Sequence, residues 1–185
     1  MKTKDHFFKA VCTLAIPVAL QSMLQSSFSM VDQIMIGQLG EINVAGVGLA
    51  GKFASIYSVV ISAIGAVAGI MIAQYLGQKN RSEVRRSFFT NLLLGAGIAG
   101  MFMVICTLFP NQIMGAYTRD VQTRQAAAEY LMLISGTFVP MAGATLLSTL
   151  FRCLEKPRLP LYASILSALL NTGLNYIMIF GKLGI

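Results

Sequence analysis

The sequence predicts an all-α membrane protein, a polytopic bundle of transmembrane helices. Of its 185 residues, 56% are apolar and only 11% are charged, and the mean hydropathy is +0.71. Soluble domains carry roughly a quarter charged residues, and disordered chains combine low hydrophobicity with high charge, so the composition excludes both classes. The apolar residues also form continuous runs of helix length, without the alternation of a membrane β-barrel.

Five apolar runs are long enough to cross a bilayer, which takes about 20 residues in a helix. The first covers residues 7–36 and ends at the turn-forming segment 37–41. It is too long for a secretory signal peptide and is not followed by a small-residue cleavage site, so it counts as a span. The second covers residues 44–76 and ends at the polar segment 77–81.

The other three runs repeat the pattern of apolar helix and polar break. Residues 88–109 form the third, which ends at Pro110, and residues 126–150 form the fourth. The basic segment 152–160 separates the fourth from the fifth, residues 161–180. The last residues resemble a loop that leads into another span, so we expect a fragment of a larger protein.

Prolines and glycines indicate where these helices bend and pack. Pro17 in the first run and Pro140 in the fourth each remove a backbone hydrogen bond, which predicts a kink. Small residues at helical spacing predict close helix packing, at Gly65, Gly69, Gly95, Gly97 and Gly100. The same small residues could also line a cavity.

The Lys and Arg residues behind the net charge of +7 lie mostly on one side of the membrane, if the predicted spans alternate in direction. One side of the membrane would carry ten cations, namely Lys2, Lys4, Lys9, Lys79, Arg81, Arg85, Arg86, Arg152, Lys156 and Arg158. The other would carry Arg119, Arg124 and Lys182. Because cytoplasmic loops collect Lys and Arg, we expect a multi-pass protein of the cell membrane with a cytoplasmic N-terminus. The lipid bilayer, and not nucleic acid, is the expected partner of this charge.

The sequence holds no enzyme motif. Cys12, Cys106 and Cys153 are scattered, which indicates neither a disulfide framework nor a zinc site. The single histidine, His6, has no partner motif, and the phosphate-binding, hydrolase and metalloprotease motifs are absent. We therefore predict a protein that is not an enzyme, has no catalytic residue and needs no cofactor.

Asp32 is the one acid that lies well inside a span, five residues before Gly37. Burying a carboxylate at membrane depth is costly. Asp32 could take up a proton or hold a sodium ion with amide oxygens as further ligands, and the change of charge could drive a helix rearrangement. The alternative is that Asp32 only packs helices. Lys52, inside the second run, is interpreted as reaching the membrane interface, with a charge pair to Asp32 as the alternative.

Two stripes of polar residues accompany Asp32, each on one face of a predicted helix. In the first run these are Ser22, Gln25, Ser29 and Asp32. In the fifth run they are Ser164, Ser167, Asn171 and Asn175. Both helices are expected to run outward from the cytoplasm, which places Asn175 near the depth of Asp32. If the stripes face each other, they form a polar cavity in the outer half of the bundle.

Five segments of the sequence stand in an order and at spacings that are typical of one family. They are residues 14–17 (Leu-Ala-Ile-Pro), 31–40 (Val-Asp-Gln-Ile-Met-Ile-Gly-Gln-Leu-Gly), 73–80 (Ala-Gln-Tyr-Leu-Gly-Gln-Lys-Asn), 152–160 and 170–176 (Leu-Asn-Thr-Gly-Leu-Asn-Tyr). Over residues 14–184 the chain resembles the N-terminal portion of a multidrug and toxic compound extrusion (MATE) transporter. The resemblance implies an antiporter that exports amphipathic cationic drugs and toxic compounds in exchange for protons or sodium ions.

The resemblance also implies an architecture and a site. Such transporters have twelve helices in two six-helix lobes. Residues 1–185 would then hold about five spans of the first lobe, with the missing C-terminal lobe as a partner. The implied cation-coupling residue is Asp32. Sodium at Asp32 is the only metal ion that we expect. The expected polar neighbours are Gln25, Ser29, Asn171 and Asn175. Some family members carry an acid at the position of Asn175, which puts a two-carboxylate proton mechanism in this lobe in doubt.

Two other functions fit the same pattern. A flippase for lipid-linked sugars could share the helical plan, although it would be expected to carry more cations in its cavity than Lys52. A non-transporting membrane scaffold could use both polar stripes only to hold helices together. Ion-dependent drug efflux would separate the antiporter from both.

Overall fold

The computed structural model of the protein describes residues 2–37 and 40–179, except for the side chains of residues 2–10, 14, 32, 35, 36 and 175–179. The described backbone contains helices and no strand, which confirms the all-α class. The helices are α1 (Lys2–Gly37), α2 (Glu41–Gly77), α3 (Arg81–Leu108), α4 (Pro110–Gly115), α5 (Val121–Ser135), α6 (Phe138–Cys153) and α7 (Arg158–Ile179).

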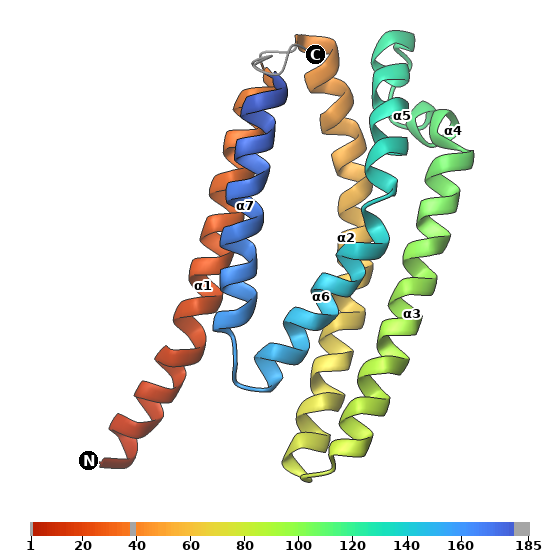
Figure 1. Cartoon of the computed structure of the whole chain (residues 1–185). Coiled ribbons are helices and arrows are strands. Elements are labelled where there is room, and N and C mark those ends of the chain that lie inside the picture. Colours follow the sequence, from red (N-terminus) through yellow and green to blue (C-terminus); the bar gives the residue numbers. More distant parts are fainter. Residues whose placement is uncertain (1, 38–39, 180–185) are drawn as a thin grey trace. The chain divides into compact units, whose positions relative to one another are not determined.

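The helices group into two compact units. The first and last helices, α1 and α7, form one of them, the α1–α7 unit (Figure 1). The helices between them, α2 to α6, form the other, the α2–α6 unit. The predicted stripe residues of the first and fifth runs therefore belong to a single unit.

Three helices of the described chain are long and apolar enough to cross a membrane. They are residues 11–31 of α1, the whole of α2 and the whole of α3. The pair α5 and α6 forms a fourth candidate span, which is bent by 52° at its break. α7 covers the predicted fifth run as far as Ile179, and residue 180 lies outside the described residues.

The predicted fourth span, residues 126–150, is two helices and not one kinked helix. Pro140 lies in the first turn of α6, and because it has no N–H, it cannot bond to the carbonyl of Gly136. At the break, Thr137 turns back on α5, since its N–H and its hydroxyl both donate to the carbonyl of Ile134, at 2.9 and 2.7 Å. The proline therefore coincides with the end of one helix and the start of the next.

Tyr57 connects three helices in the core of the α2–α6 unit. Its side chain is fully buried on α2, and its ring stacks on Phe138 of α6 with the ring centroids 4.3 Å apart. The centroid of Phe102 on α3 lies 5.4 Å away. The Tyr57 hydroxyl donates a hydrogen bond to the backbone carbonyl of Phe138 at 2.5 Å. α2 thus holds α6 at its first turn, directly after the break.

Glycines bring these helices close together at some of the predicted positions. Gly65 and Gly69 of α2 lie against threonine side chains of α6, and a Cβ on Gly95 would be 3.0 Å from a leucine side chain of α6. At Gly97 and Gly100 a Cβ would meet nothing within 4 Å. The expectation of close packing at Gly97 and Gly100 was wrong. Successive residues of a helix are turned by about 100°, and of these three glycines of α3 only Gly95 faces α6.

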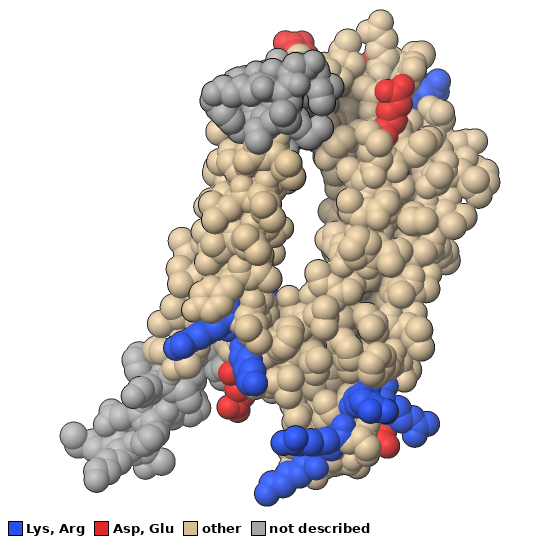
Figure 2. Space-filling model, viewed as in Figure 1, with Lys and Arg blue, Asp and Glu red and all other residues tan. Residues whose placement is uncertain are grey.

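Basic side chains gather at the turn between α2 and α3, at one end of the α2–α6 unit (Figure 2). The turn and the first turns of α3 carry Lys79, Arg81, Arg85 and Arg86, all of them exposed. Glu83 partly neutralises Arg86, with the carboxylate oxygen 4.0 Å from the guanidinium nitrogen. Because the other three cations remain, this end is strongly positive. A positive turn of this kind is expected on the side of the bilayer that the sequence predicts to be cytoplasmic, because Lys and Arg collect in cytoplasmic loops.

Candidate functional site

The α1–α7 unit contains every residue that the sequence predicts for the site. Both helices run in the same direction (Figure 1). They pack against each other. Pro17 and Gln21 of α1 are buried, and Ser164 and Thr172 of α7 are half-buried. The Nε2 atom of Gln21 donates a hydrogen bond to the Oγ atom of Ser164 at 3.0 Å. This hydrogen bond connects α1 with Ser164, a member of the predicted stripe of α7.

Gln21 is a polar residue of the contact between α1 and α7 that the sequence reasoning missed. Only 5% of it is exposed, so a polar side chain sits inside the contact between two apolar helices. The signal was present in the sequence, because Gln21 lies one helical turn before Gln25 in a run that is otherwise apolar. Two glutamines at this spacing share a face of α1.

The other stripe residues do not form the contact between α1 and α7. Ser22, Gln25 and Ser29 of α1 are exposed, and so are Ser167 and Asn171 of α7. The sequence suggested that the two stripes face each other. In the structure these residues instead lie outside the contact between α1 and α7. The physical reason is the pitch of the helix, which places the mainly apolar positions of each run between the two helices and turns the polar ones aside.

The polar stripes continue along both helices beyond the hydrogen bond between Gln21 and Ser164. Along α1, Gln25 follows Gln21 by one turn, and along α7, Asn171 follows Ser164 by two turns. Since Gln21 and Ser164 touch each other, the two polar flanks extend from one shared point.

The Gln21–Ser164 hydrogen bond also fixes the register of the two helices. Asp32 lies eleven residues beyond Gln21, and Asn175 lies eleven residues beyond Ser164. Because the helices run in the same direction and rise about 1.5 Å per residue, backbone positions 32 and 175 lie at the same height. The side chains of Asp32 and Asn175 themselves lie outside the described residues.

Lys52 belongs to α2 and is exposed. Within the described part of the chain, no ion pair includes its side chain. The same part contains no group of three or more His, Cys, Asp or Glu residues that could hold a metal ion.

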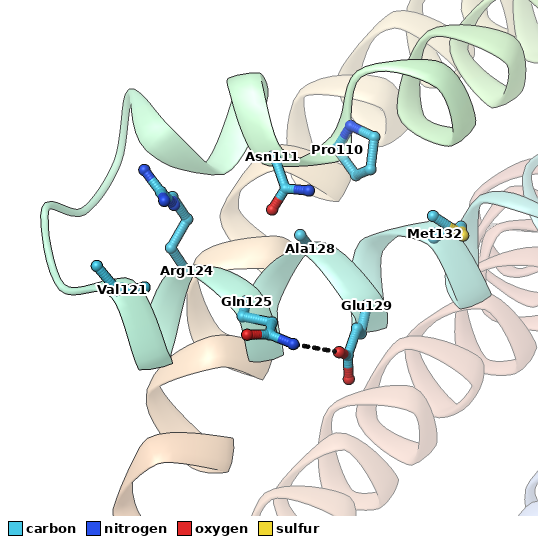
Figure 3. Close-up of a pocket in the computed structure, with 8 residues that line it drawn as sticks. All are labelled: Pro110, Asn111, Val121, Arg124, Gln125, Ala128, Glu129 and Met132. Carbon is cyan, nitrogen blue, oxygen red and sulfur yellow. Dashed lines mark hydrogen bonds between the residues drawn. The ribbon is translucent and has the colours of Figure 1, made fainter.

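A separate groove lies on the α2–α6 unit between the start of α4 and one face of α5 (Figure 3). Its volume is about 360 Å³, and it is lined by Pro110, Asn111, Val121, Arg124, Gln125, Ala128, Glu129 and Met132. The side chain of Gln125 donates a hydrogen bond to Glu129 at 3.2 Å (Figure 3). None of the predicted site residues lines this groove.

The loop beside this groove carries an acid with a shifted pKa. Asp120 caps the N-terminus of α5, where its carboxylate accepts a hydrogen bond from the N–H of Thr123 at 2.8 Å. Hydrogen bonds from Thr123 lower the pKa of Asp120 below its ordinary value. The carboxylate is therefore ionised at neutral pH and stabilises the first turn of α5.

A comparison with protein families finds one that covers most of the chain. The family model described as MatE matches residues 17–177. A protein of Streptococcus pneumoniae (strain R6) named "Probable multidrug resistance protein NorM" is 25% identical, over 100% of this chain and 41% of that protein. A protein of the same name from Thermotoga maritima is 29% identical, over 95% of this chain and 38% of that protein. The chain thus spans about two fifths of the length of the relatives it matches.

Solved structures share this fold. A MOP superfamily transporter from Pyrococcus furiosus superposes with a TM-score of 0.87 at 18% identity, over 94% of this chain and 38% of that one. A second structure, described as the outward-facing conformation of a multidrug resistance MATE family transporter, gives the same TM-score over 94% of this chain and 39% of that one. At this level of identity, the likeness concerns the fold.

Proposed function

The chain belongs to the MatE family, and from this we propose that it is part of a cation-coupled antiporter that exports amphipathic cationic drugs and toxic compounds. Members of the family are transporters, so the prediction that the protein is not an enzyme is confirmed. The names of the relatives support drug efflux as the activity. Amphipathic cations are then the substrates.

One observation carries the proposal, namely the fixed register of the α1–α7 unit. The hydrogen bond between Gln21 and Ser164 sets backbone positions 32 and 175 at the same height. Gln25 and Asn171 are exposed on the two helices that this hydrogen bond joins. A span that carries an acid and several amides along one edge is costly in a bilayer unless it serves a solvated path or an ion.

Asp32 is the ion-responsive residue in this mechanism. An ionised carboxylate at membrane depth favours a conformation in which water reaches it, whereas a neutralised one tolerates an apolar environment. Binding of a proton or a sodium ion therefore shifts the balance between two arrangements of the helices. The amides of Gln25, Asn171 and Asn175 and the hydroxyl of Ser29 serve as polar neighbours of the carboxylate.

The same proposal includes the partners and the orientation of the protein. Transport requires the second lobe of a longer protein, because two lobes must move against each other for alternating access. The positive turn between α2 and α3 supports a cytoplasmic position for that end and for the N-terminus. The membrane is then the cell membrane.

The test replaces Asp32 with Asn in the full-length transporter. The expected result is loss of ion-driven drug efflux from everted vesicles, with unchanged insertion into the membrane, because the amide cannot change its charge. The matched control is Asp120→Asn, the same substitution at an exposed loop residue, which should transport like the wild type. Undiminished efflux by the Asp32→Asn variant would contradict the antiporter and favour a scaffold or a flippase.

A further inference from the structure

One face of α3 carries exposed cations at its start and exposed apolar side chains directly after them. Its members are Arg85, Arg86, Phe89 and Leu93, all of them exposed. Because successive residues of a helix are turned by about 100°, these four positions lie within an arc of about 100°. The buried residues of α3, such as Gly95, lie on the other side of the helix. The four exposed side chains therefore form one surface, the outer α3 face.

The cations of this face are poorly neutralised by the protein itself. Two more cations, Lys79 and Arg81, stand in the adjoining turn, where Figure 2 shows basic side chains gathered. Glu83 approaches Arg86 only to 4.0 Å, and 79% of the Arg86 side chain is exposed. In the part of the chain that the structure describes, no acid pairs with the other three. Arg81 and Arg85 are one helical turn apart, where like charges destabilise a helix. A bound anion would remove this repulsion.

The apolar part of the face follows the cations along the helix axis. Phe89 lies one turn beyond Arg85 and Leu93 lies two turns beyond it, at about 6 and 12 Å along the axis. The exposed fractions are 53% for Phe89 and 73% for Leu93. The ring of Phe89 meets the ring of Phe88 edge-on, with the centroids 5.7 Å apart, which supports it on this face. A cationic end followed by an apolar stretch matches the two parts of an anionic phospholipid, the phosphate headgroup and the acyl chain.

We propose that the outer α3 face binds an anionic phospholipid. Its phosphate lies at Arg85 and Arg86, since a guanidinium binds phosphate through paired hydrogen bonds. Its acyl chain lies along Phe89 and Leu93. α3 is long and apolar enough to cross a membrane, and a cluster of Lys and Arg at the cytoplasmic end of such a helix attracts anionic lipids. The inference goes beyond the proposed function and depends neither on Asp32 nor on the coupling ion.

The experiment measures the binding of phosphatidylglycerol to the full-length protein in a nonionic detergent. Native mass spectrometry gives the apparent affinity, and thermal unfolding gives the rise of the midpoint on binding. Phosphatidylcholine with the same acyl chains tests whether the negative charge is needed. Soluble glycerol 3-phosphate tests whether a phosphate without acyl chains is enough. The wild type should prefer phosphatidylglycerol over phosphatidylcholine at least fivefold, and glycerol 3-phosphate should leave the midpoint unchanged.

Three variants test the residues of the face. Arg85→Gln/Arg86→Gln should weaken the affinity for phosphatidylglycerol about 25-fold, because each cation contributes about fivefold. Glutamine forms helices about as well as arginine, so α3 should persist. The matched control Arg119→Gln/Arg124→Gln removes two cations from the side that the sequence predicts to be outside, and it should bind like the wild type. Phe89→Ala keeps every charge and should weaken binding at least threefold.

Several outcomes would overturn the proposal. Equal affinities of the wild type for the two phospholipids would show that the negative charge is not recognised, and an equal effect of glycerol 3-phosphate would show that no lipid is needed. Wild-type affinity in Arg85→Gln/Arg86→Gln or in Phe89→Ala would contradict the site, and so would an equal loss in the control pair. Because Asp32 has no part in this face, drug efflux by Asp32→Asn tests the antiporter separately from the lipid site.

Discussion

The side chain of Gln21 on α1 donates a hydrogen bond to the hydroxyl of Ser164 on α7, 143 residues later in the chain. This contact joins the first and the last helix at a defined height. Backbone positions further along both helices, including 32 and 175, take their relative heights from it. This polar contact gives the two mainly apolar helices a defined relative register.

Replacing Gln21 with Leu should destabilise the protein. The substitution leaves the Ser164 hydroxyl without its partner, and hydrogen bonds between membrane helices contribute about 0.6–2 kcal/mol. Thermal unfolding in detergent measures the change. The double variant with Ser164→Ala should lose less than the sum of the two single variants. Strict additivity would show that the two side chains do not stabilise each other.

A methyl group should be tolerated at one glycine of α2 and not at another. A Cβ on Gly46 would lie 3.0 Å from the backbone N of Ala127, whereas a Cβ on Gly48 would meet nothing within 4 Å. Gly46→Ala should destabilise by about 1–3 kcal/mol through overpacking. Gly48→Ala should be neutral or stabilise by up to about 1 kcal/mol through helix propensity. Equal thermal midpoints for the two variants would contradict the packing of α2 on α5.

Replacing Pro140 with Ala should make α5 and α6 more nearly continuous. The new N–H can bond to the carbonyl of Gly136, which removes the main reason for the 52° bend. Spin labels at the exposed Val121 and Leu147 report the bend as a distance, which should increase.

The control for this prediction is Pro110→Ala. Pro110 stands at the first position of α4, where a backbone N–H has no helical partner in any case, so the labelled distance should stay as in the wild type. An unchanged distance in Pro140→Ala as well would show that the segment around Thr137 sets the bend without the proline.

The stability of α5 should depend on pH through Asp120. Hydrogen bonds from Thr123 lower its pKa in the folded state, so the ionised carboxylate stabilises the folded protein at pH values above its unfolded pKa of about 3.9. This contribution is lost as the pH falls through the folded pKa. The Asn in Asp120→Asn does not titrate. The difference in thermal midpoint between wild type and variant should therefore shrink on acidification, and a difference that is independent of pH would contradict this.

The helical runs were predictable from hydropathy because a membrane helix is read directly from its apolar length. The break between α5 and α6 was predictable only as a kink at Pro140. Whether a proline bends a helix or ends it depends on local hydrogen bonds such as those from Thr137 to the carbonyl of Ile134. It also depends on packing from distant parts of the chain, such as that of Tyr57 on Phe138.

The candidate site was predictable to the level of helix faces. Periodicity placed Gln25 and Asn171 on polar faces of two predicted helices, and the structure shows that these helices belong to one unit. It could not tell that Gln21 would occupy the contact and that the other polar residues would flank it. That choice depends on which side of each helix packs, and a single helix carries no information about the side that its partner will cover.

The sequence distance between Gln21 and Ser164 has a consequence for biogenesis. Ribosomes add about 5–20 residues per second, so the 143 residues between the two side chains delay their meeting by roughly 7–30 seconds after α1 has been made. During this interval α7 has not yet been synthesised, so Gln21 of α1 lacks its hydrogen-bond partner Ser164. Gln21 of the first helix therefore reaches its hydrogen-bond partner only when the last described helix has been synthesised.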